Sequence, residues 1–163
     1  MRASCLLIAA LSLAASGVAQ TTSDDVGLTL GGASITTSIG QICGPVPCQA
    51  LPGTGLSGGT TYYLVQDAAA FAPFAIAFGA PTTQCVTVPG IANALTLGTP
   101  LAIFAGGVTG PPVPVFPCPR GVATVPFTLP PNTPVGIAFH VQSVSVDWAG
   151  QLAFSPAIAL VTQ

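Results

Sequence analysis

The stretch at residues 136–148 reads GIAFHVQSVSVDW and is the longest strand candidate in the chain. Its apolar side chains fall on odd positions in the first half and on even positions in the second half. The odd ones are Ile137, Phe139 and Val141, and the even ones are Val144, Val146 and Trp148. Because strand side chains alternate strictly between two faces, this change of phase predicts a bulge or bend near Gln142 and Ser143. On that register His140 points outward, as a surface histidine.

A second strand candidate, at residues 122–129, keeps one apolar phase throughout. The positions expected to face inward are Ala123, Val125, Phe127 and Leu129, and those expected to face outward are Thr124, Pro126 and Thr128. Pro126 has no amide donor for a ladder hydrogen bond. We therefore expect this strand at a sheet edge or at a bulge.

Glycine and proline, 19 and 17 of the 163 residues, divide the chain into short apolar runs. These runs lie at residues 33–39, 60–66, 74–78, 85–88, 101–105, 122–129, 136–148 and 157–162. The pattern predicts an all-β fold: an antiparallel β-sandwich, jelly-roll or immunoglobulin-like, of about eight or nine short strands. A small helix at residues 67–71, which contain three consecutive alanines, is the one helical alternative.

The beginning of the chain has the pattern of a signal peptide. Arg2 precedes an apolar run at residues 5–15, and the small residues Gly17 and Ala19 follow it. Cleavage after Ala19 would make residues 1–19 the signal peptide and residues 20–163 a single domain. No transmembrane segment is expected after the leader. The protein is therefore expected to be secreted, in the extracellular space or at the cell surface.

Four cysteines follow the leader, and in an exported chain they predict two disulfides. They are Cys43, Cys48, Cys85 and Cys118. Proximity in sequence favours Cys43 with Cys48 and Cys85 with Cys118, although all three pairings are open. A zinc site made of the four thiolates is the rival interpretation, and it is disfavoured because the spacings do not repeat.

Ionisable side chains are very scarce after the leader: one arginine, one histidine and four aspartates. Binding to nucleic acid or to anionic lipid needs clustered Lys and Arg, so neither partner is expected. Most enzyme chemistry needs a proton carrier, a metal or a cationic clamp. We therefore expect no enzyme activity, no cofactor and no metal site.

Two weak motifs run against that expectation. Residues 55–59 read GLSGG, a G-x-S-x-G match, and Asp67 and His140 follow Ser57 in the order that α/β-hydrolases use. No strand-elbow-helix context surrounds Ser57, so catalysis by it is only a remote alternative. Asp24 and Asp25 could meet Asp67 or Asp147 around a calcium ion, but adjacent aspartates close to a cleavage site are more typical of a solvated tail.

Aromatic residues offer a possible ligand contact. Trp148, Tyr62 and Tyr63 have the flat amphipathic faces on which sugars stack. Adjacent tyrosines on a strand point to opposite faces, so at most one of them is exposed on a given sheet. A carbohydrate- or cell-wall-binding module is therefore the alternative function.

Several short motifs in the C-terminal half carry a family resemblance. They are FAIAFG at residues 74–79, LTLG at 95–98, VGIAF at 135–139, VQ at 141–142, Asp147, and FSPAIAL at 154–160. The pattern resembles the uncharacterised modules that close many exported planctomycete proteins. His140 and Pro156 depart from it. The resemblance implies a secreted β-sandwich without an assigned activity, and it carries over no functional residue.

The polar faces of the expected strands carry Thr, Ser and Gln where most soluble sheets carry charges. Charged side chains normally keep strand edges from pairing with other chains. The sequence therefore favours a secreted, non-enzymatic structural, adhesive or self-assembling surface protein. Its expected partners are copies of itself, through strand edges, or other extracellular surface proteins.

Overall fold

A computed structural model describes residues 21–32, 35–114 and 120–163. Within these ranges the chain forms thirteen strands and no helix, so the all-β prediction is confirmed. The strands are β1 (Gly27–Gly32), β2 (Ile35–Gln41), β3 (Leu51–Leu56), β4 (Thr61–Ala68), β5 (Pro73–Ala80), β6 (Val86–Thr87), β7 (Ala94–Leu95), β8 (Gly98–Val108), β9 (Pro112–Val113), β10 (Arg120–Thr128), β11 (Ala138–Val146), β12 (Leu152–Phe154) and β13 (Ile158–Thr162). The expected signal peptide, residues 1–19, lies outside the described residues.

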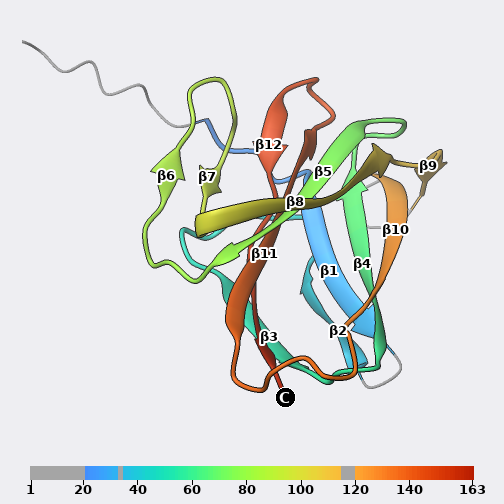
Figure 1. Cartoon of the computed structure of the whole chain (residues 1–163). Helices are drawn as coiled ribbons and strands as arrows, with labels where there is room; N and C mark the ends of the chain where they lie inside the picture. Colours follow the sequence, from blue (N-terminus) through green and yellow to red (C-terminus); the bar gives the residue numbers. More distant parts are fainter. Residues whose placement is uncertain (1–20, 33–34, 115–119) are drawn as a thin grey trace, which may run out of the picture.

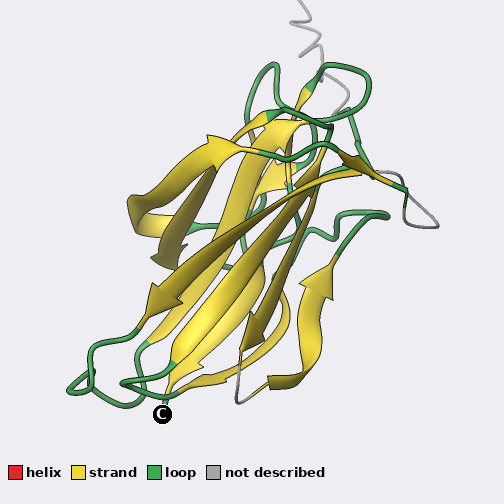
Figure 2. Ribbon diagram, turned by 90° about the vertical axis from the view of Figure 1, so that its right-hand side faces the viewer, coloured by secondary structure: helices red, strands yellow, loops and turns green. Residues whose placement is uncertain are grey.

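The strands form two main sheets that lie face to face (Figures 1 and 2). Sheet A has the order β2-β1-β4-β10-β9, and sheet B has the order β3-β13-β11-β5-β8 with β12 beside β11. A two-stranded ladder, β6-β7, stands apart from both. All pairs are antiparallel except β3 and β13, which run parallel. The expected count of eight or nine strands was too low, because four of the strands have only two or three residues.

The core lies between the inner faces of the two sheets. Sheet A contributes Leu28, Leu30, Tyr62, Leu64 and Phe127, and sheet B contributes Leu56, Phe74, Ile76, Val141, Ile158 and Leu160. The predicted alternation in β10 is confirmed: its inward-facing side chains pack on this core, and Thr124, Pro126 and Thr128 are exposed. Beyond Gly121, β10 has no described strand on its outer side, so Pro126 does lie at a sheet edge.

The predicted bulge in β11 is wrong. The register of β11 with β5 is continuous from His140, opposite Gly79, to Ser145, opposite Phe74. The apolar phase changes because both faces of β11 are buried. Its inner face packs in the core through Val141, and its outer face is covered by the segment at residues 91–98.

Gln142 is the main polar contact between β11 and that covering segment. Its side-chain oxygen accepts a hydrogen bond from Thr96 N at 2.9 Å, and its Nε2 donates to Ala94 O and Ser155 O at 2.9 and 2.8 Å. His140 lies on the same outer face, with Nδ1 3.2 Å from Thr96 O. Its predicted direction is confirmed, but it is only 8% exposed and is not the surface histidine that was expected.

The helical alternative at residues 67–71 is not what the structure shows. Strand β4 continues through Ala68 because Asp67 is paired on both sides, with Gly27 of β1 and Val122 of β10. A turn follows, with Phe71 at a φ of 57°. Pairing in the middle of a sheet therefore overrides the helical preference of the alanine run.

The favoured disulfide pairing is also wrong. The structure joins Cys48 to Cys85, with their Cα atoms 5.7 Å apart. Pro45 and Pro47 favour an extended path between Cys43 and Cys48, which opposes closure of so short a loop. Cys43 has an interaction partner of its own, and Cys118 lies outside the described residues. A bridge across 37 residues contributes about 4 kcal/mol in the chain-entropy model.

Replacing Gln142 should destabilise the fold far more than replacing another glutamine. Gln142→Ala leaves three buried backbone groups without their partner, so we expect a loss of about 2–4 kcal/mol in the free energy of unfolding. Gln151→Ala is the matched control, because the side chain of Gln151 makes one exposed hydrogen bond, to Thr21 Oγ1. Denaturant unfolding of both variants measures the difference, and equal losses would contradict the role of Gln142.

Candidate functional site: an aromatic groove beside an uncharged strand edge

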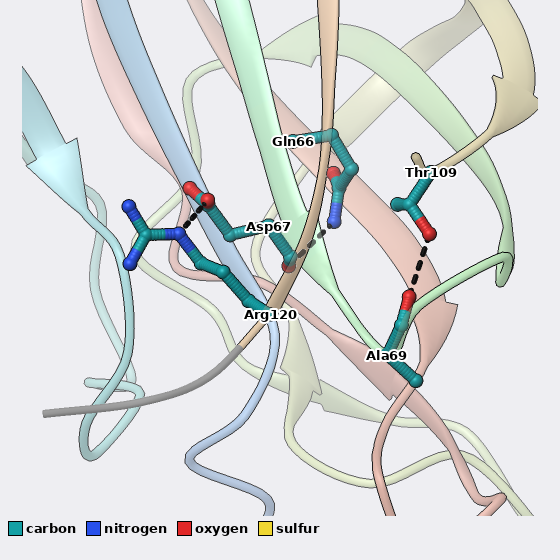
Figure 3. A network of polar contacts seen from close by, with 5 residues as sticks. All are labelled: Gln66, Asp67, Ala69, Thr109 and Arg120. Atoms are coloured by element: carbon teal, nitrogen blue, oxygen red, sulfur yellow. Dashed lines mark hydrogen bonds and ion pairs between the residues drawn. The ribbon is translucent and has the colours of Figure 1, made fainter. Parts of the chain in front are cut away.

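The strands of this protein carry almost no charge. Those of sheet B contain no Asp, Glu, Lys or Arg, and those of sheet A contain only Asp67 and Arg120. These two side chains form an ion pair between Arg120 Nε and Asp67 Oδ1 (Figure 3). The other faces and edges of the described strands therefore consist of apolar and uncharged polar side chains.

The ion pair is buried and has a structural role. Asp67 is 1% exposed and Arg120 12%. Burial raises the pKa of Asp67 to about 6, and the Arg120 guanidinium opposes part of this rise. Gln66 Nε2 donates to the backbone oxygen of Asp67 at 3.0 Å, and Thr109 Oγ1 donates to Ala69 O nearby (Figure 3). This network fastens the end of β4 to β10 and to the chain that follows β8.

Sheet B ends at β8, an edge strand of eleven residues. It pairs with β5 on one side and has no described strand on the other. Leu101, Ile103 and Val108 are 44%, 73% and 59% exposed. A long, uncharged edge with large exposed apolar side chains is the kind that pairs readily with another strand.

The register of β8 shifts where Ile76 pairs with Ala105 and Ala77 pairs with Ile103, so Phe104 is an extra residue in a bulge. Bulges at sheet edges often redirect a side chain. Here the Phe104 ring lies against rings of both sheets. Its centroid is 5.8 Å from that of Phe127 in β10 and 5.0 Å from that of Phe78 in β5.

A groove of about 540 Å³ opens where β8 and β10 border the core. At one end of the gap between β8 and β10 the chain crosses from sheet B to sheet A. There Gly110 N donates to Val122 O at 2.9 Å. Farther along β10 no described strand closes the gap. The main apolar walls are Phe78, Phe104, Phe127, Leu129, Ile137 and Phe139.

The phenylalanine walls support one another. Phe78 lies at the centre, with ring centroids 5.4 Å from Phe139 and 6.0 Å from Phe127, both edge to face. Such arrangements place the positive edge of one ring against the negative face of the next. The groove therefore has preformed walls drawn from both sheets.

The polar groups of the groove are already in use. Thr128 Oγ1 lies 2.8 Å from Thr61 Oγ1, and Thr133 Oγ1 donates to Pro130 O at 2.7 Å. Thr162 Oγ1 donates to Pro134 O and accepts a hydrogen bond from Ile137 N. None of the lining residues is ionisable. The groove can therefore recognise a ligand by shape and apolar contact, and it has no anchor for a charged group.

The three residues of the hydrolase motif do not share a site. Ser57 lies in the turn before β4, and its N–H donates to Tyr62 Oη at 2.7 Å. Asp67 lies near the far end of β4, about 20 Å along the strand. Asp67 pairs with Arg120, and the ring of His140 contacts Thr96 O in the other layer.

The predicted aromatic contacts are also separated. Tyr62 is fully buried in the core, whereas Tyr63 and Trp148 are 44% and 46% exposed. Ala69 N donates to Val146 O, so Trp148 lies near the end of β4 that is about 20 Å from Tyr63. These aromatic side chains therefore do not form one sugar-binding platform.

The aspartates do not form a metal centre in the part of the chain that is described. Burial, then the charge of Asp147 and then that of Asp24, raises the pKa of Asp25. Asp147 Oδ1 accepts hydrogen bonds from Ala149 N and Gln151 N, which closes the turn after β11. No group of three or more His, Cys, Asp or Glu residues in the described ranges is arranged to hold a metal ion.

The groove does not follow from the sequence pattern. That pattern places Phe78, Phe104, Phe127 and Phe139 on strands, and Phe127 and Phe139 in the core. The one sequence signal near the groove is Pro126, which predicts a sheet edge or a bulge beside Phe127. The other border of the groove is β8. Its position at the end of sheet B follows from the strand order, which no local sequence pattern predicts.

Comparison with known proteins does not add a family to this geometry. No protein-family model and no curated protein sequence matches the chain.

Asp67 should make the protein less stable as pH rises. Because the pKa of Asp67 is raised to about 6 in the fold, the folded state binds a proton more tightly than the unfolded state does. Stability should therefore fall between about pH 4 and pH 6 and then level off, by up to about 3 kcal/mol. Asp25, whose pKa is also raised, contributes with the same sign.

Denaturant unfolding across this pH range, with two asparagine variants, measures the effect. Asp67→Asn should remove most of the slope, whereas Asp24→Asn, at an exposed aspartate, should leave most of it in place. A slope that is unchanged in Asp67→Asn would show that other groups cause it.

Proposed function

We propose that this protein is a non-enzymatic extracellular structural protein that assembles with copies of itself through β8. The observation that carries the proposal is the edge of sheet B: eleven residues without a charge, with Leu101, Ile103 and Val108 exposed to solvent. Natural sheets usually protect such an edge with Lys, Pro, a short strand or a covering loop. Pro100 at one end and the bulge at Phe104 protect only part of β8.

A second copy of the same chain is the partner that fits this edge best. Two β8 strands related by a twofold axis run antiparallel, and each presents the same surface to the other. The run Ala105–Val108 is regular against β5 and contains two glycines, so it allows close approach of two backbones. Burial of apolar side chains on both copies would stabilise the pair, and no charge would be left unpartnered.

The ionisable side chains support a non-enzymatic role. Asp67 and Arg120 neutralise each other in a buried pair, and His140 is buried against the segment that covers β11. Ser57 lies apart from both. In this proposal the protein acts through its shape and its strand edges.

Secretion is the second part of the proposal. The Cys48–Cys85 disulfide fits an oxidising compartment, in which such bridges persist. The signal-peptide pattern at residues 1–19 has the same implication. The exported modules that the C-terminal half resembles are also expected to work outside the cell.

Self-association should depend on the face of β8 that carries Ile103. Size-exclusion chromatography with light scattering of the oxidised protein should show an average mass that rises with concentration toward that of a dimer or larger assembly. Ile103→Lys should hold the protein at the monomer mass, because each copy would bring a charge into the contact.

Val135→Lys is the matched control, because Val135 is 76% exposed and Ile103 73%. The control should associate as the unmodified protein does. A monomer at every concentration, or association that Ile103→Lys and Val135→Lys change equally, would contradict the proposal.

A further inference from the structure

We propose that the groove between β8 and β10 is a binding site for a neutral apolar small molecule, such as a hydrocarbon chain or an aromatic compound. The site is separate from the strand pairing proposed for β8. Its volume, about 540 Å³, lies within the range of about 300–1,000 Å³ that is typical of small-molecule pockets.

The shape of the groove comes from side chains of both sheets. Phe78 and Phe139 of sheet B face Phe127 of sheet A, and Phe104 borders the opening. Their edge-to-face contacts exist without a ligand, so little conformational entropy would be lost on binding. A preformed apolar pocket of this kind favours a small hydrophobic guest.

An added β-strand does not fit the groove well. Val122 O faces the open edge of β10, where it accepts the hydrogen bond from Gly110 N. Backbone groups face the same side at every second residue, so Pro126 also faces that edge, where it has no N–H to donate. On the other border the bulge at Phe104 interrupts the ladder of β8. Along the groove, neither strand edge therefore offers an unbroken row of backbone hydrogen-bonding groups.

The chemistry of the lining selects a neutral ligand. The hydroxyl groups of Thr128, Thr133 and Thr162 already have partners within the protein, and no lining residue is ionisable. A charged group placed inside would lose its hydration without gaining a partner. Apolar contact is therefore the interaction on which binding depends.

The groove and the proposed assembly contact use different faces of β8. Ile103 and Leu101 line a separate hollow with Ala75 and Ala77, on the face of sheet B away from sheet A. Phe104, through the bulge, faces the groove. Variants can therefore test the two proposals separately.

The uncharged fluorescent probe N-phenyl-1-naphthylamine, added to the oxidised full chain, tests the site. We expect saturable binding with enhanced fluorescence, and displacement of the probe by 1-dodecanol. Ile137→Asp should weaken probe binding by about tenfold or more, because it puts a carboxylate into the apolar wall. Ile137 is 47% exposed, so the variant is expected to fold.

Val135→Asp is the matched control, two residues away and outside the lining, and should bind the probe as the unmodified protein does. Ile103→Lys should also keep probe binding while losing self-association. No saturable binding by the unmodified protein, or equal binding by Ile137→Asp and Val135→Asp, would overturn the proposal. Loss of binding in Ile103→Lys would move the site to the contact between copies and would also overturn it.

Discussion

The fold depends on the contact between the inner faces of its two sheets. Strand alternation places one large apolar residue after another on that face, as with Leu28 and Leu30 in β1 and Phe74 and Ile76 in β5. Each such side chain contributes about 1.5–3 kcal/mol when fully buried. With so few charged residues, ion pairs add little to this contact. The Asp67–Arg120 pair adds a local fastening between β4 and β10, and its own burial is costly.

Apolar burial is not limited to the space between the two sheets. Because both faces of β11 are buried, a third layer covers the outer face of sheet B at this strand. The inner face joins the core, and the outer face is covered by the segment at residues 91–98. Gln142 satisfies the backbone groups that this cover would otherwise leave without hydrogen bonds. A neutral amide suits the position, because it donates and accepts without the desolvation cost of a charge. The same scarcity of charge thus shapes the core and the polar contacts around it.

The scarcity of charge also shapes the open side of the sandwich. The crossing at Gly110 closes one end of that side, and beyond it the aromatic interior stays accessible between β8 and β10. Charged side chains at such a border would keep both strands and hydrophobic molecules away. Here the strand edge and the groove are left available, which is why the two proposals concern neighbouring parts of one strand. In both proposals, binding would bury apolar surface that the two sheets leave exposed.

The sequence by itself determined the all-β class, the inward and outward faces of β10, and the placement of Pro126 at a sheet edge or a bulge. Each of these follows from side-chain alternation or from a missing amide, which are local properties. The tertiary structure decided what depends on distant segments. It removed the bulge expected near Gln142 by covering the second face of β11, continued β4 through Asp67, and paired Cys48 with Cys85. The aromatic groove also depends on distant segments. Its apolar walls come from four strands and the turns beside them, and only the packing of the two sheets brings those segments together.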